Sequence, residues 1–375
     1  MKKTAILLIV TIIFSLFSLA SCKKNEYEPV ESTELEATEV MSFTLDGESY
    51  SVRYELYRAL FLNYKTEIDG GDDSVWTGAD KEEYIAEIDE KIIEAASRIY
   101  SAIAAAKKIG YDPYSAKVEA DIKELIRQSV EGGTRGGVTV GGYDSYQDYL
   151  HALKEMNLNY SVQVLLYRYA LAIEALEEYY IGTASAEDIE NNESKPGAIQ
   201  YTKDTVREFY ESDECVRVIR MQLQTSYDKD PSSRLERARE AVLSAVAGGE
   251  SAVIAAMIGA GSITAAKEMQ DGFVIGKHNL DKGIYGELTE AAFGLLPYGV
   301  SEAIKINDGD ESYHVILFRT DKSEEHFESC YSSILYIYLK NEVGKTLDDA
   351  AESMINSTRV FDFLTNLDRS TITME

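Results

Sequence analysis

The stretch AAFGLLPYGVSEAI, from Ala291 to Ile304, indicates a short apolar helix, a turn at Pro297 and Gly299, and the start of a strand. Strand-like alternation of apolar and polar residues flanks it, and an amphipathic helix pattern lies upstream. The order strand, helix, helical turn, strand, helix, strand predicts an α+β domain of about one hundred residues. The segments concerned are CVRVIRMQLQ (215–224), RLERAREAVLSAV (234–246), GFVIG (272–276) and SYHVILFR (312–319).

Apolar residues at helical spacing dominate both sides of this domain. One stripe contains Tyr54, Tyr57, Leu60, Phe61 and Tyr64, and a second contains Tyr84, Ile85, Ile88, Ile92, Ile99 and Ile103. The tail from Ser323 returns to the same helical pattern. We therefore predict a mostly α fold with an inserted α+β domain. The helical domain comprises residues 41–211 and 323–375, and the inserted domain comprises residues 212–322.

Several local signals refine this prediction. Asp46-Gly47 is a hairpin turn signal, and Thr202 is a candidate helix cap. The glycine-rich residues 132–142 lack the Gly-Lys-Ser/Thr ending of a phosphate-binding loop, which predicts a flexible connector. The apolar segment 159–180 is interrupted by charged residues such as Arg168, which favours a buried core helix over a membrane span.

The charge balance argues against a nucleic-acid partner. The chain has 375 residues and a formal net charge of −28, from 37 basic and 65 acidic residues. A phosphate-binding surface needs clustered Lys and Arg, and the sequence shows no such cluster after Lys24. Hydrophobic residues make up 45% of the chain, which is enough for sizeable cores.

The N-terminus predicts export and a lipid anchor. A basic start, MKK, precedes the apolar run TAILLIVTIIFSLFSLA, which is typical of a signal peptide. The run ends at Leu19, Ala20, Ser21 and Cys22, which resembles the bacterial lipobox, whose cysteine becomes acylated. We predict that residues 1–21 are removed and that residues 22–40 form a flexible tether. An uncleaved membrane anchor is the alternative, because the run approaches the ~20 residues that span a bilayer.

The cysteines and histidines point to no cofactor. The four histidines, His151, His278, His314 and His326, show no ligand spacing, so we expect neither a metal site nor a cofactor. Cys215 and Cys330 lie in apolar periodic segments. They are expected to be buried free thiols, although a bridge between them remains open in an exported protein.

The α+β block resembles the parvulin-type peptidyl-prolyl isomerase domain. The residues that carry the resemblance are GGESAVIAAMIGAGS (248–262), GFVIG (272–276), ELTEAAFGLLPYGVSEAI (287–304) and YHVILFR (313–319). With the flanking helices, the segment LDGESYSVRYEL (45–56) and a lipobox cysteine, the whole order is similar to PrsA-like and SurA-like foldases. The resemblance implies a helical chaperone domain completed by both chain ends.

The resemblance also implies a set of site residues. The histidine of the last strand corresponds to His314, and a polar position between the strands corresponds to Ser262. The histidine of the first strand corresponds to Arg220, which cannot act as a neutral imidazole. The proline pocket corresponds to Ile284 and Leu288, so the family's flat aromatic wall is absent there. Phe293 corresponds to a core phenylalanine and is expected to serve packing.

These observations predict an extracytoplasmic, lipid-anchored folding factor whose partners are unfolded or newly secreted polypeptides. Two alternatives stay open at this point. The first is a holdase of the same fold without isomerase activity. The second is a solute-binding lipoprotein, although such proteins alternate strand and helix throughout, whereas residues 80–180 have an almost wholly helical pattern.

The anchor gives the first testable prediction. Replacing Cys22 by Ser should release the protein from the membrane fraction or leave it unprocessed, because serine offers no thiol for acylation. Fractionation followed by mass measurement of the mature chain checks this. Unchanged membrane retention at the mature size would contradict the lipoprotein assignment.

Overall fold

The computed structural model describes residues 27–69, 73–135, 138–140, 142–183, 195–225, 230–278, 280, 284–308 and 311–373. The chain forms two compact units, Met1–Leu176 with Thr346–Glu375 (unit 1) and Glu177–Lys345 (unit 2). Compact units and independently folding domains need not coincide, so the predicted domain limits at 211/212 and 322/323 stay a prediction. The predicted fold class, mostly α with an α+β part, is confirmed.

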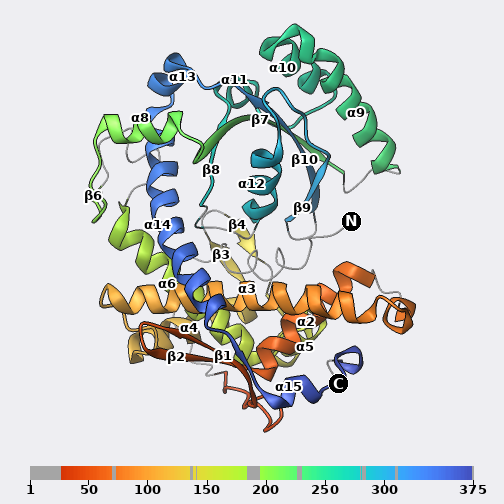
Figure 1. Ribbon diagram of the computed structural model, residues 1–375, viewed down its shortest axis with the longest axis vertical. Helices are drawn as coiled ribbons and strands as arrows, with labels where there is room; N and C mark the ends of the chain where they lie inside the picture. The colour runs from red at the N-terminus through yellow and green to blue at the C-terminus, as the bar shows by residue number, and fades with distance from the viewer. Residues whose placement is uncertain are drawn as a thin grey trace. The chain divides into compact units, whose positions relative to one another are not determined.

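Unit 1 is built mainly from helices, with a small sheet made by both ends of the chain (Figure 1). Helix α6 (Tyr160–Tyr180) begins in unit 1 and ends in unit 2, and helix α14 (Tyr331–Asn356) begins in unit 2 and ends in unit 1. The other elements are β1 (Glu39–Leu45), β2 (Glu48–Arg53), α2 (Tyr54–Asp69), η1 (Asp73–Thr77), α3 (Lys81–Lys108), α4 (Ala116–Glu131), β3 (Gly133–Arg135), β4 (Val138–Val140), α5 (Tyr146–Glu155), β11 (Arg359–Val360), α15 (Asp362–Asn366) and η3 (Arg369–Thr371).

The sheet of unit 1 has the order β11-β1-β2, and all its pairs are antiparallel. Asp46 and Gly47 form the two-residue loop between β1 and β2, and both have a positive φ, of 52° and 82°. Positive φ at both central residues is what a type I′ hairpin turn requires. The predicted hairpin is therefore confirmed, and β11 ties the C-terminal tail to β1.

The helical stripes predicted in unit 1 form its core. Tyr57 and Phe61 on α2 are fully buried, as are Ile88, Ile92 and Ile103 on α3. Helix α6 (Tyr160–Tyr180) is largely buried, as predicted. Within the described ranges, no helix combines the length and the apolar character needed to span a bilayer.

Two sequence-based expectations for unit 1 differ from the structure. The glycine-rich segment, predicted as a flexible connector, contains the antiparallel pair β3–β4, because residues 133–135 and 138–140 are spaced for a hairpin. Part of the predicted flexible tether lies against the unit: the Ser32 hydroxyl donates to a Glu55 carboxylate oxygen at 2.6 Å and contacts the Ser161 hydroxyl. The Cys22 end of the tether lies outside the described residues.

Unit 2 combines a four-stranded antiparallel sheet with short helices and ends in a long helix, α14 (Tyr331–Asn356). As predicted, Thr202 caps a helix, α8 (Lys203–Glu211): the Thr202 hydroxyl accepts the N–H of Thr205 at 3.2 Å. The other elements are β5 (Gly182–Thr183), β6 (Lys195–Pro196), β7 (Cys215–Gln224), α9 (Pro231–Ala245), η2 (Val246–Gly248), α10 (Glu250–Gly259), α11 (Ala266–Asp271), β8 (Phe273–Gly276), α12 (Ile284–Gly294), β9 (Ile304–Asp308), β10 (Glu311–Thr320) and α13 (Glu324–Ser329).

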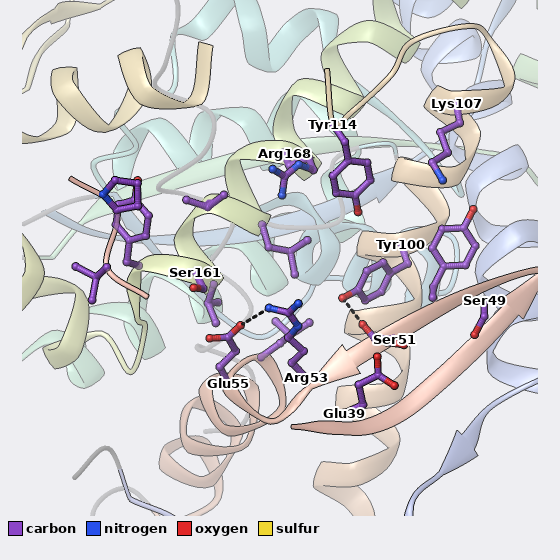
Figure 2. Close-up of a pocket in the computed structure, with 18 residues that line it drawn as sticks. Glu39, Ser49, Ser51, Arg53, Glu55, Tyr100, Lys107, Tyr114, Ser161 and Arg168 are labelled. Carbon is purple, nitrogen blue, oxygen red and sulfur yellow. Dashed lines mark hydrogen bonds and ion pairs between the residues drawn. The ribbon is translucent and has the colours of Figure 1, made fainter. Parts of the chain in front are cut away.

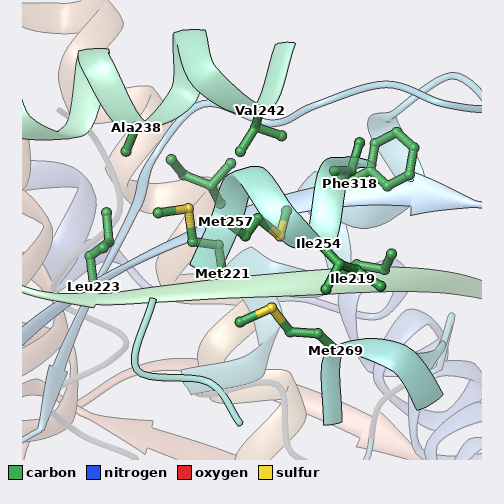
Figure 3. Packing of buried hydrophobic residues seen from close by; sticks show 11 residues of the cluster. Ile219, Met221, Leu223, Ala238, Val242, Ile254, Met257, Met269 and Phe318 are labelled. Carbon is green, nitrogen blue, oxygen red and sulfur yellow. The ribbon is translucent and has the colours of Figure 1, made fainter. Parts of the chain in front are cut away.

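The sheet of unit 2 has the order β8-β7-β10-β9. Strands β7 and β10 pair without a register shift, from Arg217↔Thr320 to Gln224↔Tyr313. Both faces of this central pair are covered. Ile219, Met221, Leu223, Ile316 and Phe318 face α9, α10 and α11 in one core cluster (Figure 3). Val216, Val218, Val315 and Leu317 face α12 in a second.

A partly buried charged cluster closes one end of the sheet in unit 2. The Arg217 guanidinium donates to both carboxylate oxygens of Glu250 at 2.9 Å, and the Thr320 hydroxyl donates to the same carboxylate at 2.7 Å. The imidazole Nδ1 of buried His326 lies 2.9 Å from the Tyr210 hydroxyl. Cys215 and Cys330 are both free, the first buried and the second partly exposed.

This cluster makes the stability of unit 2 dependent on pH. Burial, together with the nearby Arg217 charge, lowers the pKa of His326. Partial burial alone would raise the pKa of Glu250, but the hydrogen bonds from Arg217 and Thr320 outweigh it and lower that pKa. In both cases the unfolded chain binds more protons, so stability rises with pH. The His326 contribution is complete above its unfolded pKa of about 6.5, and the Glu250 contribution above about 4.3.

We therefore expect the free energy of unfolding of unit 2 to fall as the pH drops below about 6.5, and further below about 4.3. Hydrogen exchange of the β7 and β10 amides at a series of pH values measures it. Replacing His326 by Gln should flatten the upper part of the profile. Replacing Glu250 by Gln should cost about 1–3 kcal/mol at pH 7, less than for a fully buried pair because the Glu250 side chain is 33% exposed. A flat profile in the native chain would contradict this account.

Candidate functional site

A pocket of about 440 Å³ lies on the α12 side of the sheet in unit 2. Its volume falls in the range of about 300–1,000 Å³ that is typical of ligand pockets. It is lined by residues of the sheet, of α12 and of α14. The residues used below are Arg220, Phe273, Leu288, Leu317, Ile337 and Asn341.

Arg220 lies over an aromatic ring in this pocket. Its guanidinium carbon is 4.2 Å from the centre of the Phe273 ring. Strand register explains the contact, because Phe273 is directly opposite Val218 on β7, and Arg220 is two residues further along the same face. A guanidinium over an aromatic face contributes about 0.5–2 kcal/mol, depending on how far it is removed from water. The contact holds the Phe273 ring as a fixed wall.

A glycine allows helix α14 to approach the sheet closely. A Cβ atom on Gly276 would lie 3.0 Å from the Asn341 side-chain oxygen and 3.4 Å from an Ile337 methyl. The same Asn341 oxygen accepts the backbone N–H of His278 at 2.9 Å, just after β8. The Asn341 Nδ2 also donates to Glu214, just before β7, at 3.3 Å. The wall formed by α14 is therefore held against the sheet by side-chain hydrogen bonds and by the absence of a side chain at Gly276.

The structure does not bring His314 and Arg220 together. His314 is directly opposite Leu223, and Arg220 is directly opposite Leu317. Residues directly opposite each other share a face, and positions 220 and 223 differ by an odd number, so the two side chains lie on opposite faces of the sheet. The expectation that Arg220 and His314 belong to one set of site residues therefore does not fit the register.

His314 has a local partner instead. Its Nδ1 lies 2.9 Å from the Thr225 hydroxyl. Partial burial lowers the pKa of His314, and the Lys305 charge on β9 adds to the effect. The imidazole is therefore neutral at neutral pH and hydrogen-bonded at the end of the sheet.

Ser262 takes part in backbone structure. Its hydroxyl oxygen accepts the N–H groups of Gln222 and Thr264, each at 3.2 Å. The next residue, Ile263, donates its N–H to the Gln222 carbonyl at 2.8 Å. Ser262 thus joins the loop after α10 to β7, and nothing in these contacts connects it with the pocket beside α12.

Of the residues predicted for the proline pocket, Leu288 lines the pocket. It lies on α12 and is buried, at 4% exposure, against the sheet. Phe293 packs against the same core cluster, as its predicted packing role requires, and lies outside the pocket lining. Ile284 begins α12, and its side chain lies outside the described part of the structure. Whether these residues bind proline stays a prediction.

Sequence reasoning missed the aromatic wall. Phe273 lies in a strand that the sequence did predict, and alternation places it on the face of Ile275. The α14 wall was missed because Ile337 and Asn341 lie in the tail, which was assigned to the other domain. Their spacing of four residues on one helix face was a usable signal.

The pocket is suited to binding an apolar group beside a hydrogen-bond acceptor. Phe273, Leu288, Leu317 and Ile337 provide apolar surface, and the Arg220 guanidinium can only donate hydrogen bonds. A peptide carbonyl fits such a donor. Among the described residues, no group of three or more His, Cys, Asp or Glu side chains is placed to hold a metal ion.

Comparison with known proteins adds little to this geometry. No protein-family model and no curated protein matches the chain. Similar solved structures include the foldase protein PrsA from Streptococcus pneumoniae, at 10% identity and a TM-score of 0.22, covering 89% of this chain and 97% of that one. Another is the foldase protein PrsA from Lactococcus lactis, at 12% identity and a TM-score of 0.23, covering 87% and 96%. Similarity at these TM-scores carries no argument about function.

The opposite-face arrangement gives a quantitative prediction. The two side chains are three residues apart along the ladder, about 10 Å, so substitutions of Arg220 and His314 by Gln should be additive in unfolding free energy within about 0.5 kcal/mol. Arg220→Gln combined with Phe273→Leu should instead show coupling of about 0.5–1 kcal/mol, because these side chains touch. Urea unfolding of the single and double variants measures both. Strong coupling between Arg220 and His314 would show that they share a site.

Proposed function

We propose that the chain is an extracytoplasmic, lipid-anchored folding factor that binds unfolded polypeptides, with unit 2 as a parvulin-like client-binding domain. The observation that carries the proposal is the apolar pocket in unit 2, where Arg220 lies over Phe273 beside Leu288. The anchor rests on the sequence around Cys22 alone, which lies outside the described residues. Because the same N-terminal sequence predicts export, the proposed clients are secreted chains.

The pocket supports a binding mode for unfolded segments. A client's proline ring or aliphatic side chain would contact Phe273 and Leu288, and the guanidinium of Arg220 would donate to a neighbouring peptide carbonyl. Burial of apolar surface supplies the attraction, at about 25 cal/mol per Å². The single hydrogen bond sets the direction of the peptide.

Isomerisation of proline bonds is expected to be weak. The barrier to rotation about an X-Pro bond is about 18–20 kcal/mol, and catalysis requires the twisted peptide to be bound more tightly than the planar one. The resemblance implies a pair of histidines for this task. Here one position is Arg220, and His314 lies on the other face of the sheet with Thr225 as its partner. Binding without efficient isomerisation, the holdase alternative, is therefore favoured over an active isomerase.

The alternative of a solute-binding lipoprotein has less support. Such proteins alternate strand and helix in a largely parallel sheet. In the described residues, helices dominate unit 1, and the sheets are antiparallel.

The test combines two assays on the full mature chain, with Cys22→Ser to permit purification without lipid. The first measures suppression of aggregation of a chemically unfolded protein. The second measures the exchange rate of the X-Pro bond in a short peptide by NMR. We expect suppression near equimolar protein, and a peptide exchange rate within about two-fold of the uncatalysed rate.

Matched variants connect the activity to the pocket. Ile337→Asp should weaken suppression several-fold, because it places a carboxylate in the apolar pocket, whereas Ile337→Leu should retain it. Aggregation suppression absent in the native chain would refute the folding-factor proposal. Robust isomerisation abolished by His314→Ala would instead support the enzyme.

A further inference from the structure

Strand β2 forms one edge of the sheet in unit 1. The sheet order is β11-β1-β2, and no described strand pairs with the outer side of β2. An open strand edge presents unpaired N–H and C=O groups that can pair with an added strand. Only the residues of β2 whose N–H and C=O groups point away from β1 can pair in this way.

Strand β1 shows which residues those are. The N–H of Thr44 donates to the Ser357 hydroxyl oxygen at 2.8 Å, and that hydroxyl shares its one hydrogen between the Thr44 carbonyl at 2.9 Å and the Met354 carbonyl at 2.8 Å. Both groups of Thr44 are thus engaged away from β2, so the opposing pair Thr44↔Ser49 is not hydrogen-bonded. In an antiparallel ladder such pairs recur at every second residue, which makes Ser42↔Ser51 the next one. Ser49 and Ser51 therefore point their backbone groups outward.

A side chain on α3 gives independent support. The Tyr100 hydroxyl donates to the Ser51 carbonyl at 2.8 Å, from outside the sheet (Figure 2). Within the described residues, neither the backbone groups of Ser49 nor the N–H of Ser51 has a partner. The edge thus offers the N–H and C=O groups of Ser49 and Ser51 for pairing, and the Ser51 carbonyl already accepts the Tyr100 hydroxyl.

This edge opens into a pocket of about 490 Å³ within unit 1 (Figure 2). Tyr114, which is 50% exposed, lines it. Its ring lies 4.6 Å from the Arg168 guanidinium carbon and 5.9 Å from the Lys107 ammonium. Lys107 is also 5.5 Å from the Tyr50 ring of β2, which places Tyr114 beside the strand. An exposed aromatic ring is thus fixed next to the open edge.

We infer that β2 accepts an extended segment of an unfolded polypeptide as an added strand, with one apolar side chain of that segment packed on Tyr114. The segment's backbone would pair with Ser49 and Ser51. The inference rests on the proposed client-binding function, and it names a second contact point, in unit 1, that recognises main chain rather than sequence.

The charges of the pocket favour this occupant over a small anion. Each cation at the pocket already contacts a carboxylate: Arg168 contacts Glu119, Lys107 contacts Glu48 at 3.0 Å, and Arg53 is 3.8 Å from Glu55. An anion would have to compete with these acids. Main-chain groups spaced at every second residue are matched by an extended backbone, which needs no charge.

Hydrogen exchange gives the direct test. The probe is a fluorescent seven-residue peptide that alternates Tyr and Thr, added in excess to the full mature chain carrying Cys22→Ser. We expect the Ser49 and Ser51 amides to exchange at least about ten-fold more slowly when the peptide is bound, while Tyr50 and Val52, already paired with β1, change little. Protection without this alternation, or no binding, would overturn the inference.

Two substitutions should shift the peptide Kd in opposite directions. Ser51→Pro removes the outward N–H and should weaken binding by about ten-fold or more, and the matched Ser51→Ala should not. Tyr100→Phe uncovers the Ser51 carbonyl and should tighten binding between about two-fold and ten-fold. An unchanged Kd in Tyr100→Phe would contradict the proposed pairing.

A further test uses the native chain, so that it does not depend on whether Ser51→Pro folds. The same peptide with an N-methyl group on every residue cannot donate a main-chain hydrogen bond from either edge and should lose binding by at least about ten-fold. Equal binding of the methylated peptide would overturn the inference. If the native chain suppresses aggregation while these peptide results fail, the site is wrong and the proposed function stands. If suppression is also absent, both fail.

Discussion

The unbroken register between β7 and β10 is the constraint on which unit 2 depends. Because every pair from Arg217↔Thr320 to Gln224↔Tyr313 is in register, the two-residue period of the strands assigns each side chain to one face. One face packs against α9, α10 and α11, and the other packs against α12 and opens into the pocket. A slip of one residue would move the β7 side chains to the opposite core and separate Arg217 from Glu250. The pocket is therefore a consequence of strand pairing and not of any single catalytic residue.

The two-residue period of the strands also determines the sheet of unit 1, where it decides which backbone groups face outward. Strand β1 is paired on both sides, with β11 and with β2, so its backbone groups are divided between two neighbours. Both groups of Thr44 lie against Ser357, on the side away from β2, and the alternation of the ladder directs the backbone groups of Ser49 and Ser51 outward from β2. The two-residue Asp46-Gly47 loop fixes the register between β1 and β2, and this register determines which groups the edge of β2 presents. An open edge is a hazard for aggregation in most proteins, and under the proposed function it would serve to bind clients.

The sequence predicted the elements better than the site. Alternation in residues 215–224 and 312–319, the Asp46-Gly47 turn and the Thr202 cap all depend on local chemistry, and each is found where it was predicted. The site required the register between distant strands, which no local pattern specifies, so His314 and Arg220 were assigned to one site although they face opposite ways. The α14 wall was missed for a related reason. Its approach depends on Gly276, whose missing side chain matters only once the helix is known to lie there.

Cations held over aromatic rings are the feature common to the two pockets. Arg220 lies over Phe273 in unit 2, and Arg168 lies over Tyr114 in unit 1. In a chain with a net charge of −28, a cation used in this way fixes a ring and presents no free positive surface. Under the proposed function, acidic segments of a client would therefore gain little from either pocket and would be repelled by the surrounding charge. Apolar and main-chain contacts remain as the means of recognition, and these are the groups that an unfolded polypeptide exposes and a folded protein conceals.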